Sequence, residues 1–150
     1  MIYLRKAEEK DIPKLYEYLN KKYVEKNFSD IKKTEKEYIE WYKESLCLEK
    51  YIFLIVEDEN KNFIGHIRYE DFIDFYDVMI FIRENNRNKG FGKDALKKSF
   101  SFINKKIIAR ILDENIISKS IFEKTGFNFI GKDKEFNIYE KNIDINYYIC

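Results

Sequence analysis

The chain alternates short apolar runs with amphipathic stretches over most of its length. The apolar runs are rich in Ile, Val, Phe and Tyr and have the length of β-strands. The runs at 51–57 and 63–72 flank a polar turn at 58–62, so they predict a hairpin. The other expected strands are at 2–5, 78–82, 107–112, 127–130 and 135–139.

Apolar residues at helical spacing predict four helices, at about 11–19, 34–48, 93–104 and 118–125. The first is expected to begin at Asp11, as N-cap, with Pro13 in its first turn. Thr34 and Glu37 have the spacing of a capping box at the start of the second. The inward stripe of that second helix is expected to hold Tyr38, Trp41, Tyr42, Ser45 and Leu46, and Cys47 is expected in the core.

The order of these elements predicts a mixed α/β domain with a mostly antiparallel sheet. Because a helix connects strands 78–82 and 107–112, these two are expected to run parallel. The 150 residues are the size of one domain, 1–150, in which the tail 141–150 has no predicted place.

A polar loop containing two glycines, Arg87-Asn88-Lys89-Gly90-Phe91-Gly92, stands between the strand 78–82 and the helix that follows. Backbone N–H groups at a helix start have no partner in the helix and favour an anion. The stretch therefore predicts a phosphate-binding loop.

Three phosphate-loop patterns compete for this stretch. A Walker-type loop needs four residues between its glycines and then Lys-Ser/Thr, whereas here one residue separates Gly90 from Gly92, and Asp94 follows Lys93. A dinucleotide fingerprint fits 90–95 and even finds Asp113 about 20 residues on. This fingerprint does not fit its position in the chain. Seven polar or charged residues separate the strand end from Gly90, where a tight turn is needed, and too little chain follows for the strands of a dinucleotide fold. The third pattern is R-x-x-G-x-G.

A second stretch, Asn115 to Phe127, fits N-x-x-[AS]-x-x-x-[YF]-x-K-x-G-F. Together with R-x-x-G-x-G, in this order, it resembles the GCN5-related N-acetyltransferase (GNAT) family over about residues 1–141. The resemblance implies the GNAT fold, with about seven strands, about four helices and a parallel pair at the cofactor cleft. It also implies acetyl-CoA as cosubstrate and direct attack of a primary amine on the thioester.

The resemblance carries cofactor-binding roles onto this chain residue by residue. The pantetheine arm would pair with the strand before the loop, the pyrophosphate would bind the loop, and the second motif would contact the cofactor arm. The residues concerned are Phe81, Ile82, Arg87, Asn88, Lys89, Gly90, Phe91, Gly92, Lys93, Asn115, Ser118, Phe122 and Lys124.

Two candidates for proton transfer follow from the chemistry. The family's frequent Tyr acid is replaced by Phe122, so Tyr139 is the candidate acid, and a thiol of pKa about 8.5 can also leave unassisted. Asp77, at the head of the central strand, is the candidate base, with Glu70 and Asp71 as alternatives. For each of these groups a purely structural role remains open.

The resemblance also implies that the acceptor binds to the first two helices, the loop between them and the closing hairpin. The expected contacts are Phe28, Tyr38, Trp41, His66 and Glu70. The pattern resembles the GNAT subset that acetylates nucleotide-linked amino sugars, although Glu25 and Tyr38 depart from it. Ribosomal-protein-type acetylation of protein N-terminal amines is the alternative, and a non-catalytic acyl-CoA-binding module is the second.

Charge and composition limit the partners. The net charge is +1 with mixed signs, which favours neither nucleic acid nor a membrane surface. One His and two unrelated Cys give no metal-site spacing. No apolar run of membrane-spanning length or leader pattern is found, so we expect a cytoplasmic protein, with a small-molecule amine as partner and a homodimer allowed.

Overall fold

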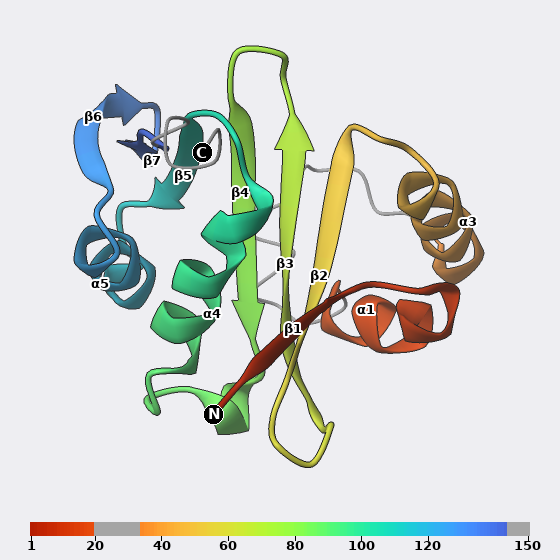
Figure 1. The fold of residues 1–150 in the computed structure, drawn as a ribbon. Helices are drawn as coiled ribbons and strands as arrows, with labels where there is room; N and C mark the ends of the chain where they lie inside the picture. Colours follow the sequence, from red (N-terminus) through yellow and green to blue (C-terminus); the bar gives the residue numbers. More distant parts are fainter. Residues whose placement is uncertain (20–33, 144–150) are drawn as a thin grey trace, which may run out of the picture.

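A seven-stranded sheet flanked by helices forms the protein, in the computed structural model that describes residues 1–19 and 34–143 (Figure 1). The strand order is β1-β2-β3-β4-β5-β7-β6, and only β4 and β5 run parallel. The strands are β1 (Tyr3–Lys6), β2 (Tyr51–Glu57), β3 (Phe63–Asp71), β4 (Tyr76–Ile82), β5 (Ile107–Leu112), β6 (Asn128–Asp133) and β7 (Phe136–Lys141). The helices are α1 (Ile12–Leu19), α3 (Glu35–Leu46), α4 (Phe91–Ser99) and α5 (Ile116–Lys124). The predicted mixed α/β fold is confirmed.

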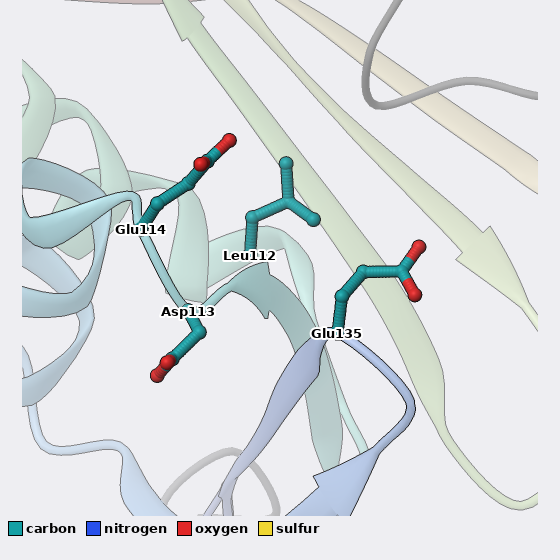
Figure 2. A pocket seen from close by; sticks show the side chains of 4 residues that line it. All are labelled: Leu112, Asp113, Glu114 and Glu135. Atoms are coloured by element: carbon teal, nitrogen blue, oxygen red, sulfur yellow. The ribbon is translucent and has the colours of Figure 1, made fainter.

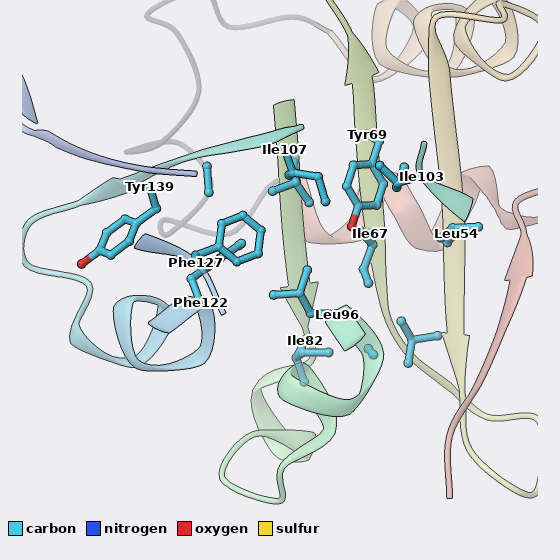
Figure 3. Close-up of a cluster of buried hydrophobic side chains, with 14 of the residues drawn as sticks. Leu54, Ile67, Tyr69, Ile82, Leu96, Ile103, Ile107, Phe122, Phe127 and Tyr139 are labelled. Carbon is cyan, nitrogen blue, oxygen red and sulfur yellow. The ribbon is translucent and has the colours of Figure 1, made fainter. Parts of the chain in front are cut away.

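Each face of the sheet has its own apolar cluster. The face covered by α4 and α5 buries one set of side chains, ten of which are labelled in Figure 3: Leu54, Ile67, Tyr69, Ile82, Leu96, Ile103, Ile107, Phe122, Phe127 and Tyr139. The face covered by α1 and α3 buries the other: Ile12, Leu15, Tyr42, Phe53, Ile55, Phe63 and Phe81. Side chains alternate along each strand, so the sheet divides the molecule into two chemically separate sides.

The parallel pair is short. Only Tyr76 with Ile107 and Asp77 with Ile108 are in register, although β4 has seven residues and β5 has six. The two strands therefore part beyond Asp77, and the carboxyl half of β4 has β3 as its only strand partner among the described residues.

A register shift in the β2–β3 hairpin moves one residue to the opposite face from the one expected. Val56 faces Gly65 and Glu57 faces Phe63, so Ile64 is the extra residue of a β-bulge. The sequence alternation predicts Ile64 on the same face as His66, but Ile64 packs in the α4/α5 cluster instead. The bulge also brings the backbone close at Gly65, where a Cβ would lie 2.0 Å from the Phe81 carbonyl oxygen.

Three local predictions differ from the structure. Asp11 does not cap a helix, because it lies inside a 3₁₀ turn, Glu9–Asp11, whose N-cap is Glu8. Its buried carboxylate accepts hydrogen bonds from Glu8 N–H and from Arg5. Cys47 is exposed, because α3 ends at Leu46 and the chain turns outward there. The helix expected to reach 104 ends at Ser99 and continues as a 3₁₀ turn, Phe100–Phe102. The capping box at Thr34 is confirmed.

Candidate active site

The parted half of β4 presents backbone N–H groups toward β5 that pair with no strand of the described residues. Arg83 N–H donates to Ile64 O on the β3 side, whereas Tyr76 N–H donates to Lys106 O on the β5 side. Backbone direction alternates along a strand, so the N–H groups of Ile80 and Ile82 point to the β5 side, where no strand pairs with them. A linear ligand with amide groups can pair there as an added strand would.

The predicted loop leads from this strand edge directly to the start of α4. Glu84–Asn86 form a 3₁₀ turn, Asn88 has φ 63° and Gly90 has φ 79°, so the chain turns sharply through two left-handed positions. Asp94 N–H donates to Gly90 O as the first helical bond. The N–H groups of residues 91–93 precede that bond, and no side chain of residue 90 caps them. They form an open anion site at the positive end of the helix dipole.

The two glycines of the loop have different roles. At Gly90 an added Cβ meets nothing within 4 Å, but its φ of 79° is a conformation that other residues adopt at a cost. At Gly92 an added Cβ would lie 3.0 Å from Ile121 Cδ1 and 3.5 Å from Ile82 Cγ1. Gly92 therefore lets α4 approach α5 and β4, and its Cβ would point into the core, away from the anion site that the sequence suggested.

Basic side chains surround the same loop. Arg87 Nε donates to Ile82 O at 3.0 Å, and its guanidinium lies 5.7 Å from the Phe81 ring centroid, so it ties the loop to the end of β4. Lys89 is exposed and Lys93 is half-buried in the first turn of α4. Phe81, in contrast, turns its ring into the α1/α3 cluster and its backbone groups toward β3. The ligand-facing backbone is that of Ile80 and Ile82.

The second motif forms the start of α5. Asn115 Oδ1 accepts from Ser118 N–H at 3.1 Å, so the Asn side chain is the N-cap of this helix. Phe122 is 3% exposed and meets Phe127 edge-on, with ring centroids 4.9 Å apart. Lys124 is exposed. Cofactor contacts by these residues stay a prediction. The structure adds that Asn115 caps α5 and that Phe122 packs against Phe127.

The predicted base, Asp77, lies on the opposite face of the sheet, which α1 and α3 cover. Burial raises the pKa of its carboxyl, while the charges of Arg110 and Arg68 partly offset that rise and Glu70 adds to it. Glu70 faces Asp77 directly across β3 and β4. A half-buried carboxyl with a raised pKa at the point where two strands part is suited to accept a proton. Of the alternatives, Asp71 lies on the other face, bonded to Lys105.

His66 projects from the same sheet face as Asp77, but its side chain is not accessible to solvent. Its side chain is 2% exposed and stacks on Phe81 with a centroid distance of 5.8 Å. Burial, with the nearby charge of Arg68, lowers the pKa of His66 to about 3. The ring is therefore neutral at physiological pH and offers almost no exposed surface, in contrast to the substrate contact expected from sequence.

The predicted aromatic wall is present in part. Trp41 is half-buried, meets Tyr42, Tyr51 and Phe53 edge-on, and has the Arg68 guanidinium 5.9 Å from its ring centroid. Tyr38 lies on the same helix and is half-buried. Phe28 lies outside the described residues. Trp41 and Arg68 thus join α3 to the sheet face that carries Asp77 and Glu70.

Tyr139, the predicted acid, is on the opposite side of the sheet from Asp77. It faces Ala109 and Phe129 across β5 and β6, and it packs in the α4/α5 cluster (Figure 3). Its hydroxyl donates to Glu123 Oε1 at 2.9 Å. Burial and this bond to a carboxylate raise the pKa of Tyr139. The structure therefore does not bring the two predicted catalytic groups together.

A hollow that sequence reasoning missed lies at the carboxyl end of β5. It has a volume of about 450 Å³ and is lined by Leu112, Asp113, Glu114 and Glu135. Figure 2 shows Leu112, Glu114 and Glu135 pointing to one side of the turn and Asp113 to the other. These residues come from a strand end, a helix start and the β6–β7 turn, so no sequence spacing could have joined them.

Other kinds of site find no support in the residues described. No group of three or more His, Cys, Asp or Glu side chains is placed to hold a metal ion in residues 1–19 and 34–143. Across the same ranges no helix has the length and apolar character needed to cross a bilayer.

Comparisons with known proteins agree with this geometry. A family profile described as an acetyltransferase (GNAT) domain matches residues 2–128. Spermidine N-acetyltransferase from Vibrio cholerae, solved with CoA and spermine, has 19% identity and a TM-score of 0.82, and the match covers 99% of this chain and 98% of that chain. A domain from Methanocaldococcus jannaschii DSM 2661 has 26% identity and a TM-score of 0.77, over 95% and 99% of the two chains. An aminoglycoside acetyltransferase, AAC(6')-Ib, has 18% identity and a TM-score of 0.78, over 94% and 93%. No curated protein sequence matches the chain.

Proposed function

The chain belongs to the GNAT acetyltransferase family, and we propose that it transfers the acetyl group of acetyl-CoA to a primary amine of a small molecule. The observation that carries the proposal is a pair of open backbone N–H sets joined by one loop. One set is at Ile80 and Ile82 on the parted edge of β4, and the other is at residues 91–93 of α4.

The donor side of the proposed reaction uses backbone more than side chains. The pantetheine arm would pair with β4, and the pyrophosphate would bind the N–H groups at the start of α4, beside Arg87 and Lys93. An N–H group of the parted strand would also stabilise the oxyanion that forms at the thioester carbon. Such preorganised donors are rigid because β4 is paired to β3 along its whole length.

The acceptor side uses the titratable face of the sheet. The amine must lose a proton to attack, and Asp77 would accept it, directly or through one water. The nitrogen then bonds to the thioester carbon and gives up a second proton to water. The carbon–sulfur bond breaks, and the CoA thiolate leaves with the electron pair. Since Tyr139 faces the other side and Phe122 has no proton to give, solvent would protonate the thiolate.

We propose a nucleotide-linked amino sugar as the acceptor. The half-buried Trp41 and Tyr38 give α3 flat aromatic surface, suited to a sugar or base ring. Arg68 stands over Trp41 and near Asp77, so this face carries a positive charge that favours an anionic acceptor. The ribosomal-protein-type reaction, on a protein N-terminal amine, is the alternative within the same chemistry.

A polyamine is a second candidate, favoured by the hollow at the end of β5. The carboxylates of Glu114 and Glu135, which point to the same side of the turn, would suit a cation with two amines. The Vibrio cholerae neighbour is described as a spermidine N-acetyltransferase.

The test is a screen of acceptors that follows release of free CoA thiol. It would compare a nucleotide-linked 4-amino hexose, spermidine, glucosamine and a peptide with a free N-terminus, at equal concentration with saturating acetyl-CoA. The proposal expects the highest kcat/KM for the nucleotide sugar. Spermidine or the peptide as the best acceptor would reject the amino-sugar assignment, and thiol release from none would leave only an acyl-CoA-binding module.

A further inference from the structure

Arg110 is an exposed arginine in the middle of β5. Asp77 and Ile108 face each other where β4 and β5 pair, and side chains alternate along a strand, so Arg110 projects from the same sheet face as Asp77. At about 3.3 Å per residue, the backbone of Arg110 lies roughly 7 Å beyond that of Ile108, in the direction in which the strands part.

The guanidinium of Arg110 lies beside an aromatic ring. It is 5.8 Å from the Phe136 ring centroid, a cation–π contact across β5 and β7. Among the described residues no carboxylate or carbonyl takes a hydrogen bond from it, and Glu140, on the neighbouring strand, pairs with Lys106 instead. Its N–H donors therefore suit a bidentate contact with an added anion.

We propose that Arg110 recognises an anionic group, a phosphate or a carboxylate, that the acceptor carries close to its amine. This inference rests on the proposed function, since it places the amine at Asp77. A single sugar ring or a short alkyl chain spans the separation between the two groups. A nucleotide-linked amino sugar meets this requirement through its phosphate, whereas a polyamine does not.

The position of Arg110 also couples recognition to the chemistry. Its positive charge lowers the pKa of Asp77, against the effect of burial. An anion bound to Arg110 would screen that charge and make the carboxylate a stronger base. Glu70 and Arg68, both on β3, also face Asp77. Neither residue is changed in Arg110→Met.

The test uses pairs of acceptors that differ only in the anion. One pair is glucosamine and glucosamine 1-phosphate, and the other is propylamine and 4-aminobutyrate. For each, kcat/KM with saturating acetyl-CoA and the calorimetric Kd of the CoA-saturated protein are measured. The proteins are the parent, Arg110→Met, Arg110→Lys, and Lys6→Met as a control on the far edge of the sheet, with thermal unfolding to check the fold.

The parent should favour the anionic member of at least one pair by about 10- to 100-fold, the usual effect of a charge-assisted bidentate contact. Arg110→Met should lose that preference by weakening only the anionic member, Arg110→Lys should keep part of it, and Lys6→Met should keep all of it. With the neutral member, the acid limb of kcat/KM should move to higher pH in Arg110→Met.

Two results would overturn the inference: no preference for the anion in the parent, or a preference that survives in Arg110→Met. Failure of the proposed function looks different. In that case no acceptor would release CoA thiol, while calorimetry would still show Arg110-dependent binding of the anionic member.

Discussion

The two sides of the central strand differ in how they are built. The donor side consists of backbone N–H groups on β4 and at the start of α4, set in place by glycine conformation and close helix packing. The acceptor side consists of side chains, Asp77, Glu70, Arg68 and Arg110, gathered from β3, β4 and β5 on the opposite face. A backbone site can serve one invariant cosubstrate, whereas a side-chain site can change its acceptor by substitution. The following variants should therefore affect one side and spare the other.

The largest effect is expected for Asp77→Asn, which removes the proposed base while keeping its shape. We expect kcat/KM for the amine to fall by about 10²- to 10⁴-fold, the usual contribution of general base catalysis. In the parent, kcat/KM should rise with pH through a pKa above the ordinary value of about 4, because burial raises the pKa of Asp77. That limb should be absent in the variant.

Asp71→Asn is the matched control, because this carboxylate lies on the other face and is bonded to Lys105. Its kcat/KM should stay within about twofold of the parent, as for a typical surface substitution. If Asp77→Asn behaves like this control and Glu70→Gln does not, the base is the neighbouring Glu70.

The next largest effect concerns the pH dependence of stability, to which the buried His66 contributes. It tests the core beneath the acceptor face and not the catalytic groups. The pKa of His66 is about 3 in the folded protein and about 6.5 in an unfolded chain, so the unfolded state binds the extra proton first as pH falls. This group's contribution to stability should therefore be lost between pH 6.5 and 3, by roughly 5 kcal/mol in all. His66→Gln should show a smaller loss over that window in urea unfolding at each pH. Equal pH dependence in both proteins would mean that His66 is not buried in its neutral form.

A smaller effect is expected from Gly92→Ala, which tests the packing of the donor side. The new Cβ would press on the end of the Ile121 side chain, and this overpacking opposes the gain of about 1 kcal/mol that Ala gives over Gly in a helix, so unfolding free energy should fall by about 1 kcal/mol in net. The measurement is chemical denaturation with and without CoA. An unchanged stability would contradict the close contact between α4 and α5.

The smallest effect is expected from Tyr139→Phe. The lost hydrogen bond to Glu123 should cost about 1 kcal/mol of stability. Because the hydroxyl faces away from the side of Asp77, kcat should change by less than tenfold, well under the usual range for a general acid. A larger fall in kcat, most marked below the thiol pKa of about 8.5, would restore Tyr139 as the acid.

The donor side could be predicted from sequence because its determinants are local. A strand, a loop with two glycines and a helix start are contiguous in the chain, and their order identified the family that the profile match then showed. Even there, sequence could not separate the conformational role of Gly90 from the packing role of Gly92, because the latter depends on Ile121 in another helix.

The acceptor side was predicted less completely because its determinants are distant in sequence. The β-bulge at Ile64, set by pairing with β2, decided which residues share a face. Arg110 carries no signal in the sequence, because only the register places it beside Asp77, and Tyr139 proved to face the other way. Burial also changed the interpretation of His66, which the sequence analysis expected as an acceptor contact.

The most direct test of the two-sided account is calorimetric titration of CoA into the parent, Gly90→Val and Asp77→Asn. The parent should bind CoA with a Kd in the range of about 1–100 μM, ordinary for a cosubstrate. Gly90→Val should lose measurable binding, since a branched residue resists a φ of 79°, while Asp77→Asn should bind as the parent does. Binding of NAD as tight as CoA, or parent-like binding by Gly90→Val in a folded protein, would contradict the account.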